Sequence, residues 1–112
     1  MKLFGFLQKS ARETSAQSLA LQWPQPNATL IDVRTRLEWA QGHVQGAQNL
    51  DMMHDDFQDH LQQLDRQGTY YVMCRGGSRS AAAVRLMAEL GFQKVFDVKG
   101  GIVNWKGLLV RA

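Results

Sequence analysis

The sequence has 112 residues, close to the commonest size of a single domain. Apolar residues make up 45% of the chain and charged residues 21%, the balance of an ordinary globular domain. The net charge is +3, from 13 basic and 10 acidic residues without a basic run, so nothing indicates nucleic-acid binding. A mildly positive chain does suit a site that attracts a small anion.

The N-terminal residues contain a short apolar run that ends at Leu7 and is followed by Gln8-Lys9-Ser10. It is shorter than the roughly 7–15 apolar residues of a signal-peptide core. No later segment approaches the ~18 apolar residues of a membrane span. We expect a cytoplasmic protein with an N-terminal extension at residues 1–12, either helical or loose on the surface, and one domain at residues 13–112.

Four segments have the composition of β-strands. Residues 29–33 (Thr-Leu-Ile-Asp-Val) follow a Pro-rich breaker and are rich in β-branched side chains. Residues 69–73 (Thr-Tyr-Tyr-Val-Met) are apolar almost throughout, as in a central parallel strand. Residues 94–98 and the shorter segment 47–50 complete the set.

Three helical patterns lie between or before these strands, at residues 15–22, 55–64 and 80–90, with Ser15 as a possible cap of the first. The strongest places apolar side chains at i, i+3, i+4 and i+7, on Ala83, Leu86, Met87 and Leu90. Gly91 supplies a helix stop. Alternating strands and helices predict an α/β fold with a parallel sheet covered by helices.

The only cysteine, Cys74, directly follows the expected strand at 69–73, and ligands of such sheets bind at the carboxyl ends of strands. Gly76 and Gly77 permit a tight curl and a close approach of backbone to a ligand. A single cysteine excludes an internal disulfide and a Cys-rich metal site. Any group carried by this thiol must therefore pass to another molecule.

Backbone amides in this loop and the start of the next helix form an anion-binding nest. Together with the neighbouring arginines they favour the thiolate, so Cys74 is expected to be the nucleophile. Taken separately, a lone cysteine is usually a small buried apolar residue and Gly-Gly a turn, but their combination favours a functional loop. The expected substrate-binding residues are Arg75, Gly76, Gly77, Ser78, Arg79 and Ser80, with Arg75 and Arg79 recruiting an anion.

Several spaced motifs occur in order along most of the chain. They are Leu-Ile-Asp-Val-Arg at 30–34, Glu38-Trp39, Gly-His-Val-Gln-Gly-Ala at 42–47, the loop 74–79 with Ser-Ala-Ala after it, and Gly100-Gly101 before Trp105. This series resembles the signature of the rhodanese (sulfurtransferase) family. The resemblance implies a three-layer domain with a five-stranded parallel sheet and helices on both faces.

The resemblance also implies an activity. Cys74 would take a sulfane sulfur from a small anionic donor such as thiosulfate and become a persulfide. It would then pass the sulfur to cyanide, a thiol or a partner protein, without a metal or organic cofactor. An alternative within this family is a sulfur-relay module that is loaded by another protein and has little activity on small molecules.

The cell-division-cycle phosphatases and arsenate reductases are relatives of this family whose loop has five residues between Cys and Arg. Here four residues separate Cys74 from Arg79. The smaller cradle favours a sulfur atom over a phosphate, which leaves a phosphatase or arsenate reductase as a third alternative. Two departures from the family pattern are Gln45 in place of proline and a loop without the lysine of some thiosulfate enzymes, which leaves the preferred donor open.

Other polar residues of the motifs are expected to be structural. Asp32, at a strand end, can accept hydrogen bonds from loop amides, and Arg34 can pair with an acid such as Glu38. His43 is expected to tie turn backbone together rather than act as a base.

Among the aromatic residues, Trp39 and Trp105 are expected in the core or in a pocket wall, with Trp105 nearer the site. His54 and His60 are expected to face solvent. A calcium site is not expected, since the glycine and glutamate of an EF-hand are missing from the acidic stretch with Asp51, Asp55, Asp56 and Asp59.

Overall fold

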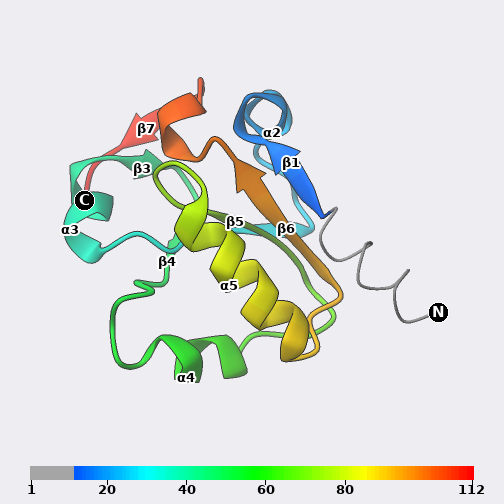
Figure 1. Ribbon diagram of the computed structural model, residues 1–112. Coiled ribbons are helices and arrows are strands. Elements are labelled where there is room, and N and C mark those ends of the chain that lie inside the picture. The colour runs from blue at the N-terminus through cyan, green and yellow to red at the C-terminus, as the bar shows by residue number, and fades with distance from the viewer. Residues whose placement is uncertain (1–11) are drawn as a thin grey trace.

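The computed structural model describes residues 12–112, so the extension expected at residues 1–12 lies outside the described residues except for Arg12. Five parallel strands form the main sheet in the order β1-β6-β5-β2-β4 (Figure 1). The strands are β1 (Glu13–Ser15), β2 (Ala28–Asp32), β4 (Gln48–Asn49), β5 (Thr69–Met73) and β6 (Lys94–Lys99). This confirms the predicted α/β fold with a five-stranded parallel sheet.

The four strands expected from the pattern are all present, and β5 has the predicted bounds. The fifth, β1, has no apolar pattern and is defined by its pairing with β6, where Glu13 stands opposite Asp97. A separate antiparallel pair joins β3 (His43–Val44) to β7 (Leu109–Val110). These two short strands bring the end of the chain beside the Gly-His-Val segment.

Four α-helices and a 3-10 turn connect the strands. They are α2 (Ala16–Gln22), α3 (Arg36–Gln41), α4 (Phe57–Gln62), α5 (Ser78–Glu89) and η1 (Ile102–Asn104). The expected cap of the first helix is confirmed, because the Ser15 side chain accepts a hydrogen bond from the Ser18 amide at 3.0 Å. None of these helices, all within residues 12–112, is long and apolar enough to cross a membrane.

The helix after the cysteine begins at Ser78, two residues before its expected start at Ser80. Gly77 precedes it with φ +128°, in a region that glycine adopts without a steric penalty. The loop between β5 and α5 is therefore only four residues long, from Cys74 to Gly77. The helix is correspondingly closer to the sulfur than the sequence suggested.

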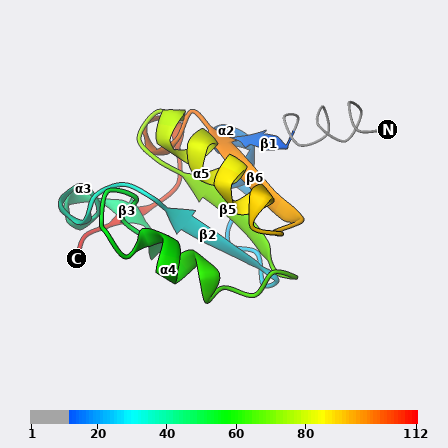
Figure 2. The same ribbon diagram turned by 60° about the horizontal axis from the view of Figure 1, so that its bottom comes forward.

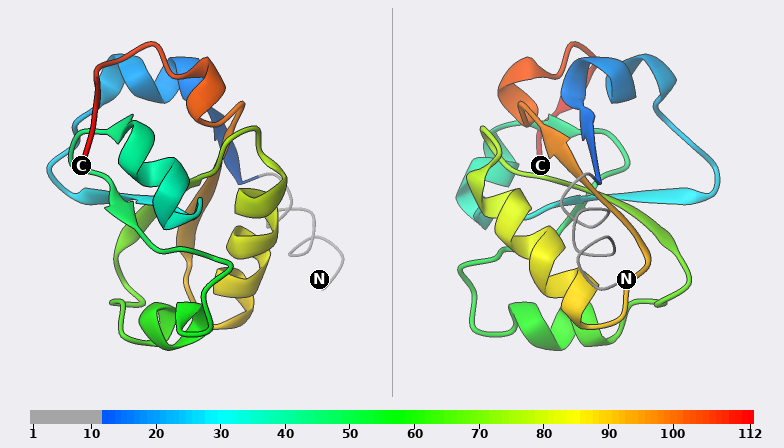
Figure 3. Two further views of the ribbon diagram at one scale, coloured as in Figure 1. Left: turned by 90° about the vertical axis from the view of Figure 1, so that its left-hand side faces the viewer. Right: turned by 45° about the vertical axis from the view of Figure 1, so that its right-hand side comes forward.

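Helices cover both faces of the sheet, so the domain has three layers (Figures 2 and 3). One core cluster joins strand residues such as Val72 to Phe57 and Leu61 of α4 and to Met87 of α5. The second joins the opposite face of the strands to residues of α2. Successive side chains of β5 alternate between the two clusters, which is the period of a strand buried on both faces.

Candidate active site

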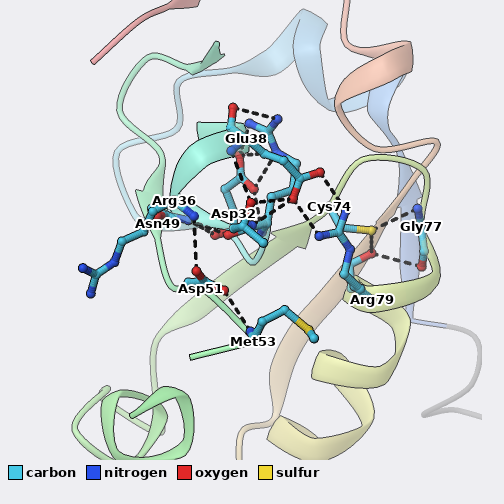
Figure 4. A network of polar contacts seen from close by, with 12 residues as sticks. Asp32, Arg36, Glu38, Asn49, Asp51, Met53, Cys74, Gly77 and Arg79 are labelled. Atoms are coloured by element: carbon cyan, nitrogen blue, oxygen red, sulfur yellow. Dashed lines mark hydrogen bonds and ion pairs between the residues drawn. The ribbon is translucent and has the colours of Figure 1, made fainter. Parts of the chain in front are cut away.

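Cys74 follows the carboxyl end of β5, and its side chain lies inside the short turn that leads to α5 (Figure 4). The Gly77 amide donates a hydrogen bond to the Cys74 sulfur at 3.0 Å. The thiol in turn lies 3.4 Å from the Ser80 hydroxyl oxygen. Cys74 is only 1% exposed. The chain therefore wraps the sulfur closely, as the Gly76-Gly77 pair predicts.

The ionisation of Cys74 is governed by two opposing effects. Burial raises the pKa of the thiol, because a charged sulfur loses its hydration. A hydrogen bond with the Ser80 side chain and hydrogen bonds from the backbone amides of Ser80, Gly77 and Arg79 lower it, and the net result is a pKa below the ordinary value. A thiolate is thus favoured by the amides of one turn and the first turn of α5.

The turn after β6 supports the cysteine loop from the side. The Ile102 amide donates to the Cys74 carbonyl at 3.0 Å, and the Val103 amide donates to the Arg75 carbonyl at 3.3 Å. Gly101 has φ +57°, and a β-carbon there would collide with both carbonyl oxygens. The Gly100-Gly101 motif therefore lets two backbones approach closely and fixes the entrance to the loop.

Arg79 reaches across to α3 and forms an ion pair with Glu38. Its two terminal nitrogens donate to the two carboxylate oxygens at 2.8 and 3.1 Å (Figure 4). The Arg79 hydrogen bond, opposed by burial and aided by Thr35, lowers the pKa of Glu38 from 4.5 to about 2. Arg79 is thus held beside the loop by a carboxylate, and its charge is partly balanced.

Arg34 pairs with Asp32 and not with the Glu38 carboxylate, so the expected Arg34–Glu38 ion pair is wrong. Arg34 Nη2 lies 2.8 Å from Asp32 Oδ2 and also donates to the Gly42 carbonyl at 2.7 Å. It meets Glu38 only at the backbone carbonyl. Arg34 follows β2 by two residues, and its side chain turns back to Asp32, the last residue of that strand, which leaves the Glu38 side chain to Arg79. Asp32 and Arg34 therefore join the strand end to the turn at Gly42.

The motif histidine and tryptophans also have packing roles. The His43 Nδ1 atom lies 2.8 Å from the Trp39 carbonyl oxygen, and its ring stacks on the Trp39 indole with centroids 3.5 Å apart. Trp105 packs in the core cluster on the α2 face, away from the cluster that contains Cys74. There it lines a cavity of about 480 Å³ with Trp23. Trp105 is therefore a core and pocket-wall residue, as predicted, but it belongs to the cluster on the face of the sheet opposite to that of Cys74.

The remaining loop residues face outward. Arg75, Gly76 and Ser78 are exposed, whereas Ser80 is fully buried. Within residues 12–112, no carboxylate forms a salt bridge with Arg75, and no group of three or more His, Cys, Asp or Glu side chains is arranged to hold a metal ion. Of the predicted loop residues, the structure therefore brings Gly77 and Ser80 into contact with the sulfur, and it leaves Arg75, Gly76 and Ser78 at the surface.

The sequence and the fold both match known proteins. The family model of the rhodanese-like domain matches residues 15–108. This chain belongs to the rhodanese-like domain family. A curated relative, the probable adenylyltransferase/sulfurtransferase MoeZ of Mycobacterium tuberculosis, is 36% identical over 76 residues, which are 68% of this chain and 19% of MoeZ. The rhodanese-like chain therefore spans about a fifth of the length of that relative.

Solved rhodanese-like structures overlay on most of the chain. The rhodanese-like domain of a protein from Anabaena has a TM-score of 0.79 at 29% identity, over 90% of this chain and 80% of that one. A rhodanese-related protein from Thermoplasma volcanium has a TM-score of 0.73 at 29% identity, over 88% and 97% of the two chains. A rhodanese-like domain protein from Staphylococcus aureus has a TM-score of 0.71 at 30% identity, over 85% and 90%. The family resemblance in the sequence is confirmed.

Two side-chain features of this rhodanese-like site were missed by sequence reasoning. Ser80 was expected to contribute its backbone amide, but its hydroxyl also lies beside the sulfur. Asp97, in the middle of β6, is 6% exposed and accepts a hydrogen bond from that hydroxyl at 2.6 Å. The available signal was a single carboxyl among the apolar residues of a central strand, where a buried charge requires a partner.

Proposed function

We propose that this domain is a sulfurtransferase that carries a sulfane sulfur as a persulfide on Cys74, with thiosulfate or a similar anion as the donor. The observation that carries the proposal is the setting of the sulfur. The Gly77 amide and the Ser80 hydroxyl converge on it, and its pKa is lowered. Membership of the rhodanese-like family and the likeness to a relative named as a sulfurtransferase support the same chemistry.

The proposed reaction has two displacements at sulfur. In the first, the Cys74 thiolate attacks the outer sulfur of thiosulfate, a new S–S bond forms, and sulfite leaves with the electron pair of the broken bond. In the second, a nucleophile such as cyanide or a thiolate attacks the outer sulfur of the persulfide, and Cys74 leaves as a thiolate. No net oxidant is consumed, and the loop amides that favour the thiolate assist both steps.

Both loop arginines attract the anionic donor, but they have different freedom to do so. Arg75 is exposed and unpaired among the described residues, so its guanidinium is able to bind a donor directly. Arg79 is held by Glu38 and contributes mainly through its position near the thiolate. We expect Arg75→Ala to raise the KM for thiosulfate more than it lowers kcat.

The direct test is thiocyanate formation from thiosulfate and cyanide. The wild-type protein is expected to catalyse it, and Cys74→Ser is expected to lose at least about a thousandfold in rate because the nucleophile is removed. The unfolding transition of Cys74→Ser serves as the control for folding. Equal rates for the two proteins would overturn the proposal.

A second candidate is a sulfur-relay module that receives its sulfur from another protein. Two observations favour it: Cys74 is 1% exposed, and the matching segment is about a fifth of MoeZ. Mass spectrometry after incubation with a persulfidated protein, and separately with thiosulfate, distinguishes the two. Rapid loading by the protein alone favours the relay, whereas loading by thiosulfate favours the enzyme.

A phosphatase or arsenate reductase is less well supported. The loop places four residues between Cys74 and Arg79, and the Arg79 guanidinium is directed to Glu38 instead of over the sulfur. We expect no turnover of an aryl phosphate above the Cys74→Ser background. Turnover that is lost in that variant would favour this third function.

A further inference from the structure

Asp97 is a buried carboxyl that forms no salt bridge with any residue that the structure describes. Its side chain lies on the α5 face of the sheet, at a position of β6 that is paired on one side with Val72 and on the other with Glu13. Among residues 12–112, no arginine, lysine or histidine forms a salt bridge with it. Within the same part of the chain, its side chain accepts one hydrogen bond, from the Ser80 hydroxyl at 2.6 Å. Ionising a carboxyl in this environment costs free energy, because burial disfavours the charged form.

Ser80 connects this carboxyl to the cysteine. Its hydroxyl oxygen lies 2.6 Å from Asp97 Oδ1, 3.4 Å from the Cys74 sulfur and 3.1 Å from the Gly77 carbonyl oxygen. A hydroxyl has one proton to donate and lone pairs to accept. Its orientation therefore depends on which of its neighbours carries a proton.

Two arrangements satisfy these contacts with the same total number of protons. When Asp97 is ionised, Ser80 donates to the carboxylate and accepts from the Cys74 thiol. When Asp97 is protonated, it donates to Ser80, and the Ser80 hydroxyl is free to donate to the Cys74 thiolate. Moving one proton along this line converts the first arrangement into the second.

We propose that Asp97 is a positioning residue that takes up the proton of the Cys74 thiol through the Ser80 hydroxyl. The proposal rests on the proposed sulfur-transfer function for its role in turnover, although the proton coupling itself does not require that function. Cys74 and Asp97 then titrate as a pair. Ser80 is the group that touches the reacting sulfur.

Protons and electron pairs balance in each step of this proton path, which runs from Cys74 through Ser80 to Asp97. During loading, the Sγ–H proton passes to Ser80 Oγ while the Ser80 proton passes to Asp97, and the thiolate attacks the outer sulfur of the donor as sulfite leaves. During delivery, the acceptor attacks the persulfide and Cys74 leaves as a thiolate. The proton on Asp97 then returns along the same line, so the protein ends as it began.

The charges around the pair are consistent with this assignment. Burial raises the pKa of Asp97 from its ordinary value, and hydrogen bonding from Ser80 opposes this rise. Glu13 on β1 acts in the same direction as burial, whereas Lys99 on β6 and Arg85 on α5 oppose it. On the thiol side, Arg79 of α5 is the charged group that is coupled to Cys74.

The test measures the rate of alkylation of Cys74 by iodoacetamide as a function of pH. Asp97→Asn keeps the side-chain shape but supplies an amide that donates to Ser80, which leaves the hydroxyl for the thiolate. We expect the midpoint of the alkylation profile to move to lower pH, with a rate about three- to tenfold higher on the acidic side of the wild-type midpoint. Glu89→Gln, at an exposed position near the far end of α5, is the matched control and should leave the profile unchanged.

Ser80→Ala tests the connection itself. In that background, Asp97→Asn is expected to move the midpoint little, because the hydroxyl that connects Asp97 to the sulfur has already been removed. An unchanged midpoint in Asp97→Asn, or an equal shift with and without the Ser80 hydroxyl, would overturn the proposal. A loosened fold would speed alkylation at every pH without moving the midpoint.

These readouts are independent of sulfur transfer. If thiocyanate forms but Asp97→Asn does not change the alkylation midpoint, only the proton path through Ser80 is contradicted. If the alkylation midpoint shifts as expected but no sulfur is transferred, only the proposed sulfurtransferase function is contradicted.

Discussion

Two buried aspartates, one on each of the strands that flank β5, differ in what their side chains contact. Asp32, at the end of β2, is fully buried and is held by the guanidinium of Arg34 at 2.8 Å. Asp97, in β6, is nearly as buried but faces the neutral hydroxyl of Ser80. A guanidinium stays charged at all relevant pH values, so the first carboxylate has a fixed role in joining a strand to a turn. A hydroxyl can reverse its hydrogen bond, so the second site is able to exchange a proton.

The largest expected effect on stability comes from the Asp32–Arg34 ion pair. Asp32→Asn leaves the Arg34 guanidinium buried without its counter-charge, and we expect it to lower the free energy of unfolding by about 3–5 kcal/mol. Denaturant unfolding followed by circular dichroism measures the difference. A loss below about 1 kcal/mol would mean that the pair has no structural role.

The Glu38–Arg79 pair is expected to have an intermediate effect. Both side chains keep 29% of their surface exposed, so solvent screens the pair, and we expect Glu38→Gln to cost about 1–2 kcal/mol near neutral pH. The folded pKa of Glu38, about 2, lies below its ordinary value of 4.5. The contribution is therefore complete above pH 4.5 and is lost as the pH falls toward 2.

Unfolding of wild type and Glu38→Gln in parallel at several acidic pH values checks this prediction. The two stabilities should converge as the pH falls. A constant difference across the range would show that the carboxylate charge is not what stabilises the fold.

The smallest expected effect on stability, which is of opposite sign, is at the Asp97 carboxyl. Burial raises the pKa of Asp97 above its ordinary value of 3.8, so this group costs stability once the pH exceeds that value and costs nothing below it. We expect Asp97→Asn to be neutral or to stabilise the fold by up to about 1 kcal/mol at neutral pH. The gain should vanish in acid. A loss of stability as large as that in Asp32→Asn would show that Asp97, like Asp32, stabilises the fold as a carboxylate.

Much of the fold was predictable because its main signals are local. Strand β5 is apolar almost throughout, and the cysteine, glycines and arginines that follow it are contiguous in the sequence. Strand β1 was not found because Glu13–Ser15 has no periodic pattern and exists through its pairing with β6. Helix α3 was also missed, although Thr35 and Glu38 form a capping box that a search of the sequence could have found.

The polar contacts were less predictable because they depend on how distant segments pack. Arg34 and Glu38 have the spacing of a helical pair, but the Glu38 carboxylate instead meets Arg79, 41 residues away. Likewise, no local pattern connects Ser80 to Asp97. Only the packing of α5 on β6 brings the hydroxyl, the carboxyl and the sulfur together.

The proposed function requires that Cys74 carries the transferred sulfur. Its most direct test is intact-protein mass spectrometry of the wild type and of Cys74→Ser after exposure to thiosulfate or a persulfidated protein, followed by treatment with cyanide. We predict that the wild type gains the mass of one sulfur atom and that cyanide removes it as thiocyanate, whereas Cys74→Ser gains nothing. A wild type that never acquires the additional sulfur from either donor, or a variant that acquires it equally, would contradict a persulfide on Cys74.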